Sequence, residues 1–332
     1  MENGTVMTQQ EVTQNNKDYL ARHYSGVEET MPDFLWYPYI PFGMITLVQG
    51  MPGSGKSTFL ADIIACGTNE KLLPDGTRLE SRVNAVYQCA EAGGPAIVKK
   101  MLSNAGADLD AVSFVQGDSL TLCDGRIWRL VEETHAKILV IDPMQEFLEA
   151  NMLQAQSMRK ELSEIARMAE TTGCAAILVG HFTKSENKED IYKGMGSADI
   201  SAVARSILHI RRLERSSPIR YLSQIKCNIA PEAGEYAFEI TNLGEVRWIG
   251  PVDKSDMDEI NEEEKLKRGE KRGAAERDLQ ALLSRGDMEA NEVLSKMYLK
   301  GYSDGTIRNV KKKAGVKSIK RRDGRWVWHL EP

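Results

Sequence analysis

A glycine-rich motif stands at residues 50 to 57, which read Gly-Met-Pro-Gly-Ser-Gly-Lys-Ser and match the spacing G-x-x-x-x-G-K-[ST]. Glycines let the backbone curl until successive N–H groups face one point, and the N-terminus of a following helix adds a positive dipole there. Such a loop is a cradle for phosphates. We therefore expect ATP to bind at Gly50, Pro52, Gly53, Ser54, Gly55, Lys56, Ser57 and Thr58.

Two side chains of this motif have defined roles in phosphate chemistry. Lys56 is expected to reach the β and γ phosphates, and the hydroxyl of Ser57 to ligate Mg²⁺. Asp142 is predicted as the second magnesium ligand and as part of the nucleotide site. It ends the apolar run that begins at Lys137, and the carboxyl edge of a parallel sheet would bring it beside the motif. The alternative is an ordinary aspartate at a strand end.

Glu91 and His181 follow two further apolar runs, 83–90 and 175–180. We expect Glu91 to be the catalytic base that polarises the attacking water, and His181 to contact the γ-phosphate and report its loss. A glutamate in this position could instead cap the following helix, and a single histidine is often structural. Both alternatives remain open.

The elements that must position these residues show as an alternation of short apolar runs with longer amphipathic stretches such as Met152 to Glu170. This rhythm is typical of an α/β fold with a central, mostly parallel sheet. Past Gly196 the runs are separated by turn residues, which predicts antiparallel hairpins that extend the sheet. The expected strands are 44–48, 83–89, 112–115, 138–141 and 175–179, then 205–211, 219–226, 236–240 and 246–249.

Composition divides the chain into four parts. Residues 1–30 are polar without a clear period, which predicts a flexible tail, and residues 31–252 form the core. Acidic side chains crowd residues 253–264, so we expect a solvated linker over 253–268. Residues 269–332 read as three helices (276–284, 288–299 and 303–313) and a strand pair (316–321 and 325–330), the pattern of a small winged helix-turn-helix. A purely architectural lid is the alternative.

Whole-chain properties exclude several classes of protein. The 332 residues are 42% apolar with a formal net charge of −5, which argues against a uniformly basic nucleic-acid coat. Five widely spaced cysteines include no Cys-x-x-Cys pair, so we expect reduced core thiols. No apolar run approaches the roughly 20 residues of a membrane span, and the N-terminus lacks a signal-peptide pattern. We expect a cytoplasmic protein with no membrane partner.

Basic residues gather in two places that suit DNA. Between Arg308 and Arg325 only Asp323 opposes a series of lysines and arginines, where the third helix and the wing of a winged helix would meet a duplex. The polar stretch 183–195 suits a loop that faces single-stranded DNA in a central pore, although a simple solvent loop is the alternative. The predicted contacts are Lys184, Lys188, Lys193, Arg308, Lys311, Lys312, Lys313, Lys320, Arg321 and Arg322.

Taken together, these residues resemble the RecA-like P-loop ATPases, and within them the RepA-type hexameric helicases of plasmids and phages. The resemblance covers roughly residues 35 to 250. It rests on Gly50 to Ser57, Glu91, Ile141-Asp142-Pro143, Gly180-His181-Phe-Thr-Lys184 and the segment from Gly194 to Arg205.

The resemblance implies a homo-oligomer, a hexamer, in which Arg205 is a catalytic finger inserted into the neighbouring subunit's nucleotide site. Arg211 and Arg212 are competing fingers. Many relatives have Asp where this chain has Ala92, so any secondary role of that Asp is absent.

The combined expectation is an ATP-hydrolysing, DNA-associated motor, a ring-forming replicative helicase of a mobile element that uses ATP and Mg²⁺. One alternative is a recombination ATPase that loads or anneals single-stranded DNA. Another is an ATP-switched DNA-binding regulator. The same core serves all three, so the fold by itself does not choose among them.

Overall fold

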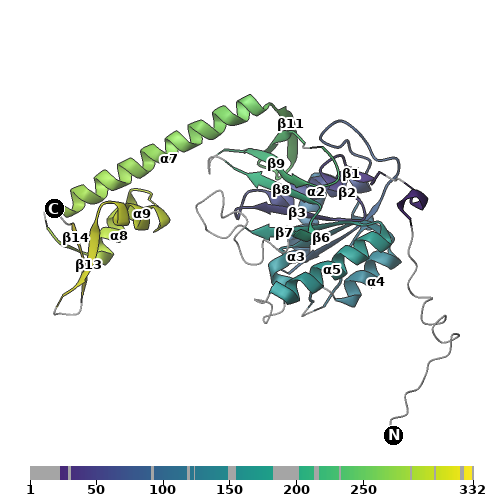
Figure 1. The fold of residues 1–332 in the computed structure, drawn as a ribbon, viewed down its shortest axis with the longest axis horizontal. Coiled ribbons are helices and arrows are strands. Elements are labelled where there is room, and N and C mark those ends of the chain that lie inside the picture. The colour runs from purple at the N-terminus through teal and green to yellow at the C-terminus, as the bar shows by residue number, and fades with distance from the viewer. Residues whose placement is uncertain are drawn as a thin grey trace, which may run out of the picture.

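In the computed structural model the described residues are 23–28, 31–90, 93–117, 120–122, 124–148, 155–181, 202–212, 217–231, 233–284, 286–302, 304–321 and 325–330. They form an α/β core and a smaller C-terminal unit that follows a long helix (Figure 1). Residues 1–22, most of the expected tail, lie outside this set. A short 3-10 turn, η2 (Tyr24–Gly26), precedes the core.

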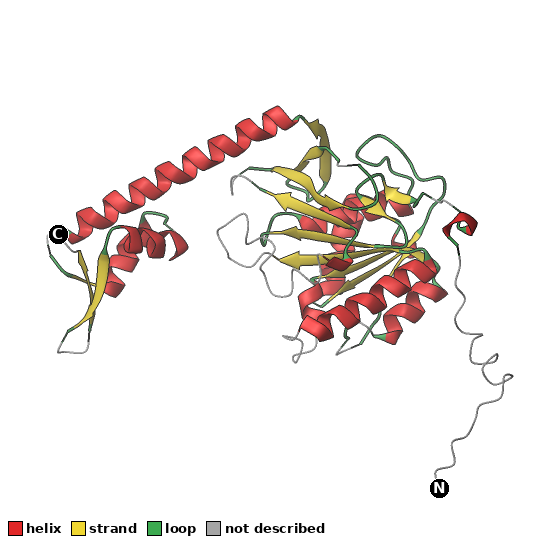
Figure 2. Ribbon diagram, viewed as in Figure 1, coloured by secondary structure: helices red, strands yellow, loops and turns green. Residues whose placement is uncertain are grey.

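A β-sheet forms the centre of the core (Figure 2). It has nine strands, in the order β11-β10-β9-β8-β3-β7-β6-β4-β5. Its parallel part consists of β3 (Ile45–Gly50), β4 (Asn84–Cys89), β5 (Val112–Ser113), β6 (Ala136–Asp142), β7 (Ala175–His181) and β8 (Ser206–Arg211). Antiparallel strands β9 (Ile219–Cys227), β10 (Glu235–Ile240) and β11 (Val246–Val252) extend it beyond β8. The predicted α/β fold and its mostly parallel central sheet are confirmed.

Helices cover both faces of the sheet. On one face lie α2 (Lys56–Thr68) and α3 (Gly94–Ala105), and on the other α4 (Gly125–Glu133) and α5 (Ala155–Thr172). Successive strand residues point to opposite faces, so Val48 of β3 joins the first hydrophobic core and Leu47 joins the second. Burial on both faces explains why the parallel strands read as continuous apolar runs. Two 3-10 turns, η3 (Leu109–Ala111) and η4 (Met144–Phe147), lie in the connections.

An aromatic cluster joins the antiparallel strands to a small N-terminal hairpin, β1 (Phe34–Trp36) and β2 (Ile40–Pro41). The Trp36 ring stacks on Tyr39 with centroids 4.0 Å apart and meets the edge of Trp248 at 5.7 Å. Such pairs add to the free energy of simple area burial. The hairpin is thereby held against β11.

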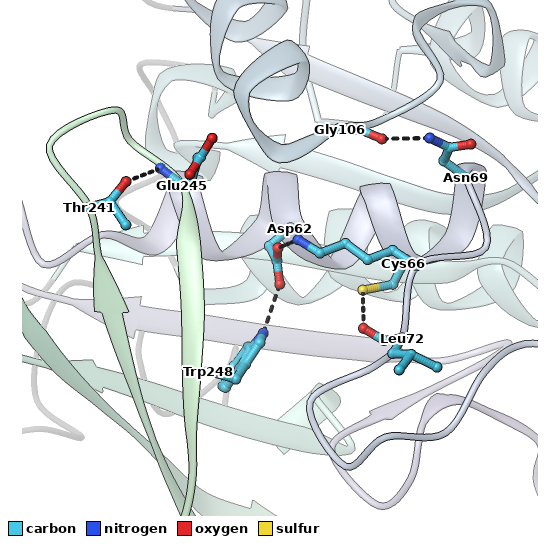
Figure 3. A network of polar contacts seen from close by, with 9 residues as sticks. Asp62, Cys66, Asn69, Leu72, Gly106, Thr241, Glu245 and Trp248 are labelled. Carbon is cyan, nitrogen blue, oxygen red and sulfur yellow. Dashed lines mark hydrogen bonds and ion pairs between the residues drawn. The ribbon is translucent and has the colours of Figure 1, made fainter.

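A buried carboxylate ties the last strand of the sheet to the helix after the glycine-rich motif. Asp62 of α2 accepts a hydrogen bond from Nε1 of Trp248 at 2.8 Å (Figure 3) and forms an ion pair with Lys71. A buried charge is tolerated only with such partners. The position of α2 therefore depends on β11, although the two elements are far apart in the sequence.

The C-terminal unit has its own core. It contains the end of α7 (Lys254–Leu283), then β12 (Met288–Glu289), α8 (Ala290–Leu299), α9 (Asp304–Lys313), β13 (Val316–Lys320) and β14 (Trp326–Leu330). Its strands form a separate sheet in the order β12-β14-β13. Leu279, Val293, Ile307 and Trp328 are buried together between the helices and this sheet. The expected second and third helices and the strand pair are present within a few residues.

The first helix of this region is longer than expected. The acidic segment 253–268 is the N-terminal half of the continuous helix α7, which also includes the expected helix at 276–284. Composition alone misses this, because Glu263 and Glu264 are each followed four residues later by a basic residue, a spacing that supports a helix. Trp326 of β14 is 52% exposed, whereas Trp328 is buried in the core of this unit. Among the helices that the structure describes, none is both long and apolar enough to cross a membrane.

Candidate functional site

The glycine-rich loop connects β3 to α2 at the carboxyl edge of the sheet. Gly53 and Gly55 have positive φ values of 73° and 95°, a conformation that favours glycine, and α2 begins directly afterwards at Lys56. A Cβ on Gly50 would lie 2.5 Å from Oγ of Ser54 and 2.6 Å from the carbonyl oxygen of Ile210. The first N–H groups of α2 have no acceptor within the helix and face the loop. The motif therefore has the geometry of an anion cradle.

Lys56 is buried at the base of this cradle. Its Nζ donates to the carbonyl oxygens of Gly50 at 3.0 Å and Met51 at 3.2 Å. Burial lowers the pKa of Lys56, and the charge of Asp142 opposes that shift. An ammonium held on loop carbonyls, close to a carboxylate, is correctly placed to meet the phosphates of a nucleotide.

Asp142 is the meeting point of three elements. Its Oδ2 atom accepts a hydrogen bond from the Ser57 hydroxyl of α2 at 2.6 Å and another from the Tyr87 hydroxyl of β4 at 2.6 Å. Burial, and then the charge of Asp142, raise the pKa of Tyr87 well above its ordinary value, so the phenol keeps its proton and remains a donor. The structure thus brings together the two predicted magnesium ligands, Ser57 and Asp142. It also shows that Tyr87 is a hydrogen-bond partner of Asp142.

This oxygen set fits Mg²⁺. The cation prefers hard oxygen ligands, usually one or two protein groups together with substrate phosphates and water. Ser57 and Asp142 supply such a pair beside the cradle. Within the cradle, the buried Oγ of Ser54 has no hydrogen-bond partner among the described residues, so it could interact with a phosphate oxygen.

Several predicted residues lie outside what the structure describes. These are Glu91 and the predicted DNA contacts Lys184, Lys188, Lys193 and Arg322. For His181 only the backbone is described: it ends β7, in register with Gly50 of the neighbouring β3. The backbone of His181 therefore lies at the carboxyl edge of the sheet, in a central strand next to β6.

Arg205 lies at one edge of the sheet, and the other two candidate fingers, Arg211 and Arg212, lie at the opposite edge. The backbone N–H of Arg205 donates to the carbonyl oxygen of Ile45, so this exposed residue stands at the start of β8 and level with the start of β3. Five strand residues, or about 16 Å, separate that level from Gly50. Arg211 ends β8 beyond His209, which is in register with Gln49 near the glycine-rich loop. Arg211 also forms an ion pair with Glu235 at 3.2 Å.

Sequence reasoning missed some polar residues at the carboxyl edge. Gln49 and His209, on adjacent strands, are both buried, and the His209 Nε2 atom lies 3.0 Å from Oε1 of Gln49. Burial, and then the charge of Arg211, lower the pKa of His209 to about 4, so the ring is neutral at pH 7. A polar residue within an apolar strand, such as Tyr87 or His209, is a signal that could have identified them.

The edge near β9 and β10 also contacts the loop. Arg220 of β9 and Ile240 of β10 lie against Gly55: a Cβ at Gly55 would be 2.4 Å from Cδ1 of Ile240 and 3.6 Å from Nε of Arg220. Glycine is therefore required at position 55 for two reasons, its φ and this close approach. No local sequence pattern reports the second.

Some of the predicted DNA-contacting residues of the C-terminal unit have partners within it. Arg308 pairs with Asp304 at 2.8 Å, Lys313 with Glu276 at 2.7 Å, and Arg321 with Asp287 at 3.7 Å. Lys311 lies over the Trp328 ring, 4.1 Å from its centroid, and Lys320 over Trp326 at 5.9 Å. These exposed ion pairs are weak, so they leave the basic side chains free to exchange partners at little cost.

Comparisons with known proteins agree with this geometry. A family model described as an AAA domain matches residues 11–187, more than half of the chain. The DNA repair protein RadA of Streptococcus pyogenes serotype M3 is 22% identical over 213 residues, which is 63% of this chain and 42% of that protein. RadA of Escherichia coli K12 is 25% identical over 146 residues, 43% of this chain and 28% of that protein. The chain thus matches less than half the length of these relatives.

A KaiC-like protein from Pyrococcus horikoshii superposes with a TM-score of 0.47 at 19% identity, over 67% of this chain and 97% of that one. The family match carries the assignment, together with the cradle formed by residues 50–57 and the Ser57–Asp142 pair. The chain belongs to the AAA domain family and carries the P-loop of an NTPase at residues 50–57.

Proposed function

We propose that this chain is an ATP-driven, DNA-associated motor that works as a ring of identical subunits, a hexameric helicase of the RepA type. The observation that carries the proposal is the position of Arg205. This residue stands at the sheet edge opposite its own P-loop, about 16 Å below Gly50 along the strands. An arginine side chain does not span that distance, so a finger role for Arg205 requires the phosphate of a neighbouring subunit.

The hydrolytic chemistry would be divided between two subunits. Mg²⁺, held by Ser57 and Asp142, would neutralise charge on the β and γ phosphates. Lys56 would hold the phosphates in place, and the Tyr87 hydroxyl would keep Asp142 oriented toward Ser57. Glu91 would polarise the attacking water and His181 would sense the γ-phosphate. Arg205 of the adjoining subunit would stabilise the charge that develops during transfer.

The C-terminal unit would provide a contact with duplex DNA. Its element order supports the proposal of a winged helix, because three helices are accompanied by β12 before α8 and by the β13–β14 pair after α9. In that arrangement α9 would enter a major groove and the β13–β14 pair would lie along phosphates. Both carry exposed basic residues, among them Arg308, Lys312 and Lys320. Single-stranded DNA would pass through the pore and contact Lys184, Lys188 and Lys193.

A second candidate is favoured by the names of the relatives. Two RadA proteins described as DNA repair proteins match the core, which supports a recombination ATPase that loads or anneals single strands. The third candidate, an ATP-switched DNA-binding regulator, needs neither a translocating ring nor strong stimulation by DNA.

One set of measurements separates these functions. The ATPase rate is measured without DNA, with single-stranded DNA and with duplex, while native mass spectrometry in ATP reports the assembly. A helicase predicts a ring, stimulation by single strands and ATP-dependent separation of a forked duplex. Annealing without ATP-dependent separation would favour the recombination ATPase. Site-specific duplex binding with negligible stimulation of hydrolysis would favour the regulator.

A further inference from the structure

Two cationic side chains lie close to the P-loop (residues 50–57): Lys56, which belongs to it, and Arg220 of β9, which packs against Gly55. Arg220 of β9 is only 6% exposed, and its Nε atom is buried without a hydrogen-bond partner among the described residues. Its Nη1 donates to the carbonyl oxygens of Ser217 at 2.7 Å and Ile219 at 3.1 Å. Nε lies 3.6 Å from the position of a Cβ on Gly55. Only the backbone of Gly55 thus lies between this guanidinium and the anion cradle.

A second guanidinium converges on the same point. Nε of Arg212 donates to the carbonyl oxygen of Ser217 at 3.0 Å, so both arginines share one acceptor. In the part of the chain that the structure describes, no carboxylate forms an ion pair with Arg220. Burial, and then the charge of Arg212, lower the pKa of Arg220. The folded chain by itself therefore disfavours this charge.

Burial of a cation without a paired anion is energetically unfavourable. An anionic ligand that binds nearby would supply the missing partner and reduce that penalty. The nearest anion site is the P-loop. The sheet order places β9 on one side of β3 and the Asp142 strand β6 on the other, two strands away in each direction. Arg220 therefore approaches the loop from the β9 side of the sheet, whereas Asp142 approaches it from the β6 side.

We propose that Arg220 is a second fixed cation of the nucleotide site, which strengthens binding of the phosphate chain from behind Gly55 in the same subunit. It is a positioning residue, since it acts through the loop and not by touching the reacting atoms. The inference rests on the NTP-binding function of the P-loop. It predicts that affinity depends on the charge at position 220 and on the number of phosphates in the ligand.

The test is calorimetric titration of ATP, ADP and inorganic tripolyphosphate into wild type, Arg220→Met, Arg220→Lys and Ile240→Val. Arg220→Met removes the charge and keeps most of the bulk, Arg220→Lys keeps the charge, and Ile240→Val disturbs the packing at Gly55 without changing charge. We expect Arg220→Met to weaken the binding of ATP and of tripolyphosphate by about 10- to 100-fold, the scale of one charge acting over roughly 6 to 12 Å at an effective dielectric constant of about 20. The affinity for ADP should fall by a smaller factor than the affinity for ATP. Arg220→Lys should restore most of the affinity, and Ile240→Val should bind as wild type does.

Other outcomes overturn the proposal. If Arg220→Met bound tripolyphosphate as wild type does but bound ATP more weakly, the contact of Arg220 would be with the nucleoside and not with the phosphates. Equal losses in Arg220→Met and Arg220→Lys would mean that shape, and not charge, matters. Thermal melting without ligand checks folding, and Arg220→Gln, which keeps a hydrogen-bond donor for Ser217, is the second neutral variant. If neither neutral variant folds, the arginine is structural and the proposal fails. Absence of ATP binding by wild type would refute nucleotide binding itself, a separate result.

Discussion

Replacement of Arg205 by alanine tests the division of the active site between subunits. The side chain starts level with Ile45, five strand residues or about 16 Å from Gly50, so its loss should leave ATP affinity of each subunit unchanged. Hydrolysis should nevertheless fall by about 10³- to 10⁵-fold, the usual effect of removing an arginine finger. The pairing of normal binding with lost turnover is the signature of a residue that acts on a neighbour.

Mixed rings make the test quantitative. A Lys56→Ala subunit lacks the P-loop lysine but keeps its finger, and an Arg205→Ala subunit keeps its P-loop but lacks the finger. In a random equimolar mixture, half of the subunits have an intact P-loop and half of their neighbours have an intact finger. Up to about a quarter of the interfaces should therefore be active. Neither variant alone should show more than residual turnover.

The assay is steady-state phosphate release over a series of mixing ratios, with native mass spectrometry to verify that mixed rings form. Activity should follow the product of the two fractions and peak at the equimolar ratio. If mixed rings form and no ratio recovers hydrolysis, the trans assignment of Arg205 is wrong. The same experiment would then be repeated with Arg211 and Arg212, which lie at the edge of the sheet that carries the P-loop.

Four further predictions concern the remaining parts of the chain. Lys56→Ala should weaken ATP binding in filter assays, whereas Glu91→Gln should retain binding and lose most hydrolysis, because only the lysine contacts ground-state phosphate. Tyr87→Phe should lower the free energy of unfolding in urea by about 1.5–3 kcal/mol, since it removes a donor to a buried carboxylate. Burial lowers the pKa of His209 to about 4, so the unfolded state takes up this proton first as the pH falls. The free energy of unfolding should then drop by roughly 2 kcal/mol more between pH 8 and pH 5 in wild type than in His209→Gln. Removal of residues 253–332, a cut placed before α7, should leave basal hydrolysis intact. The same removal should reduce the magnitude of the log–log salt slope of DNA binding by about 0.9 for each duplex phosphate that the C-terminal unit neutralises.

Controls separate these effects from general damage. Tyr39→Phe removes a 2.6 Å hydrogen bond to the neutral carbonyl oxygen of Gly234, so it should cost only about 1 kcal/mol, and an equal cost for Tyr87→Phe would mean that the charge of Asp142 is unimportant. Near-normal turnover of Glu91→Gln would remove that residue from the base role. A truncated core with unchanged DNA affinity and slope would make the C-terminal unit a docking module. If the free energy of unfolding depended on pH in the same way for wild type and His209→Gln, the assignment of a buried neutral His209 ring would be wrong.

The sequence by itself determined the features that depend on local chemistry. The loop at residues 50–57 is recognisable because glycine conformation, helix start and lysine spacing are all local properties. Continuous apolar runs identified the parallel strands, since both faces of such strands are buried. Asp142 could be named in advance because the end of a parallel strand always reaches the same sheet edge as the P-loop. The acidic segment before residue 268 shows the limit: its composition suggested a solvated linker, and only the structure shows that its backbone is helical.

Only the tertiary structure decided which strands are neighbours, and with them the partners of the site. A run of apolar residues states that a strand is buried but not which strand lies beside it. The order β9-β8-β3-β7-β6-β4 brings Tyr87 to Asp142, His209 to Gln49 and Arg220 to Gly55, pairs separated by 55 to 165 residues along the chain. The same order sets Arg205 at the edge away from its own phosphate site. Long-range contacts of this kind are the consequence of how the whole sheet assembles, which no local pattern contains.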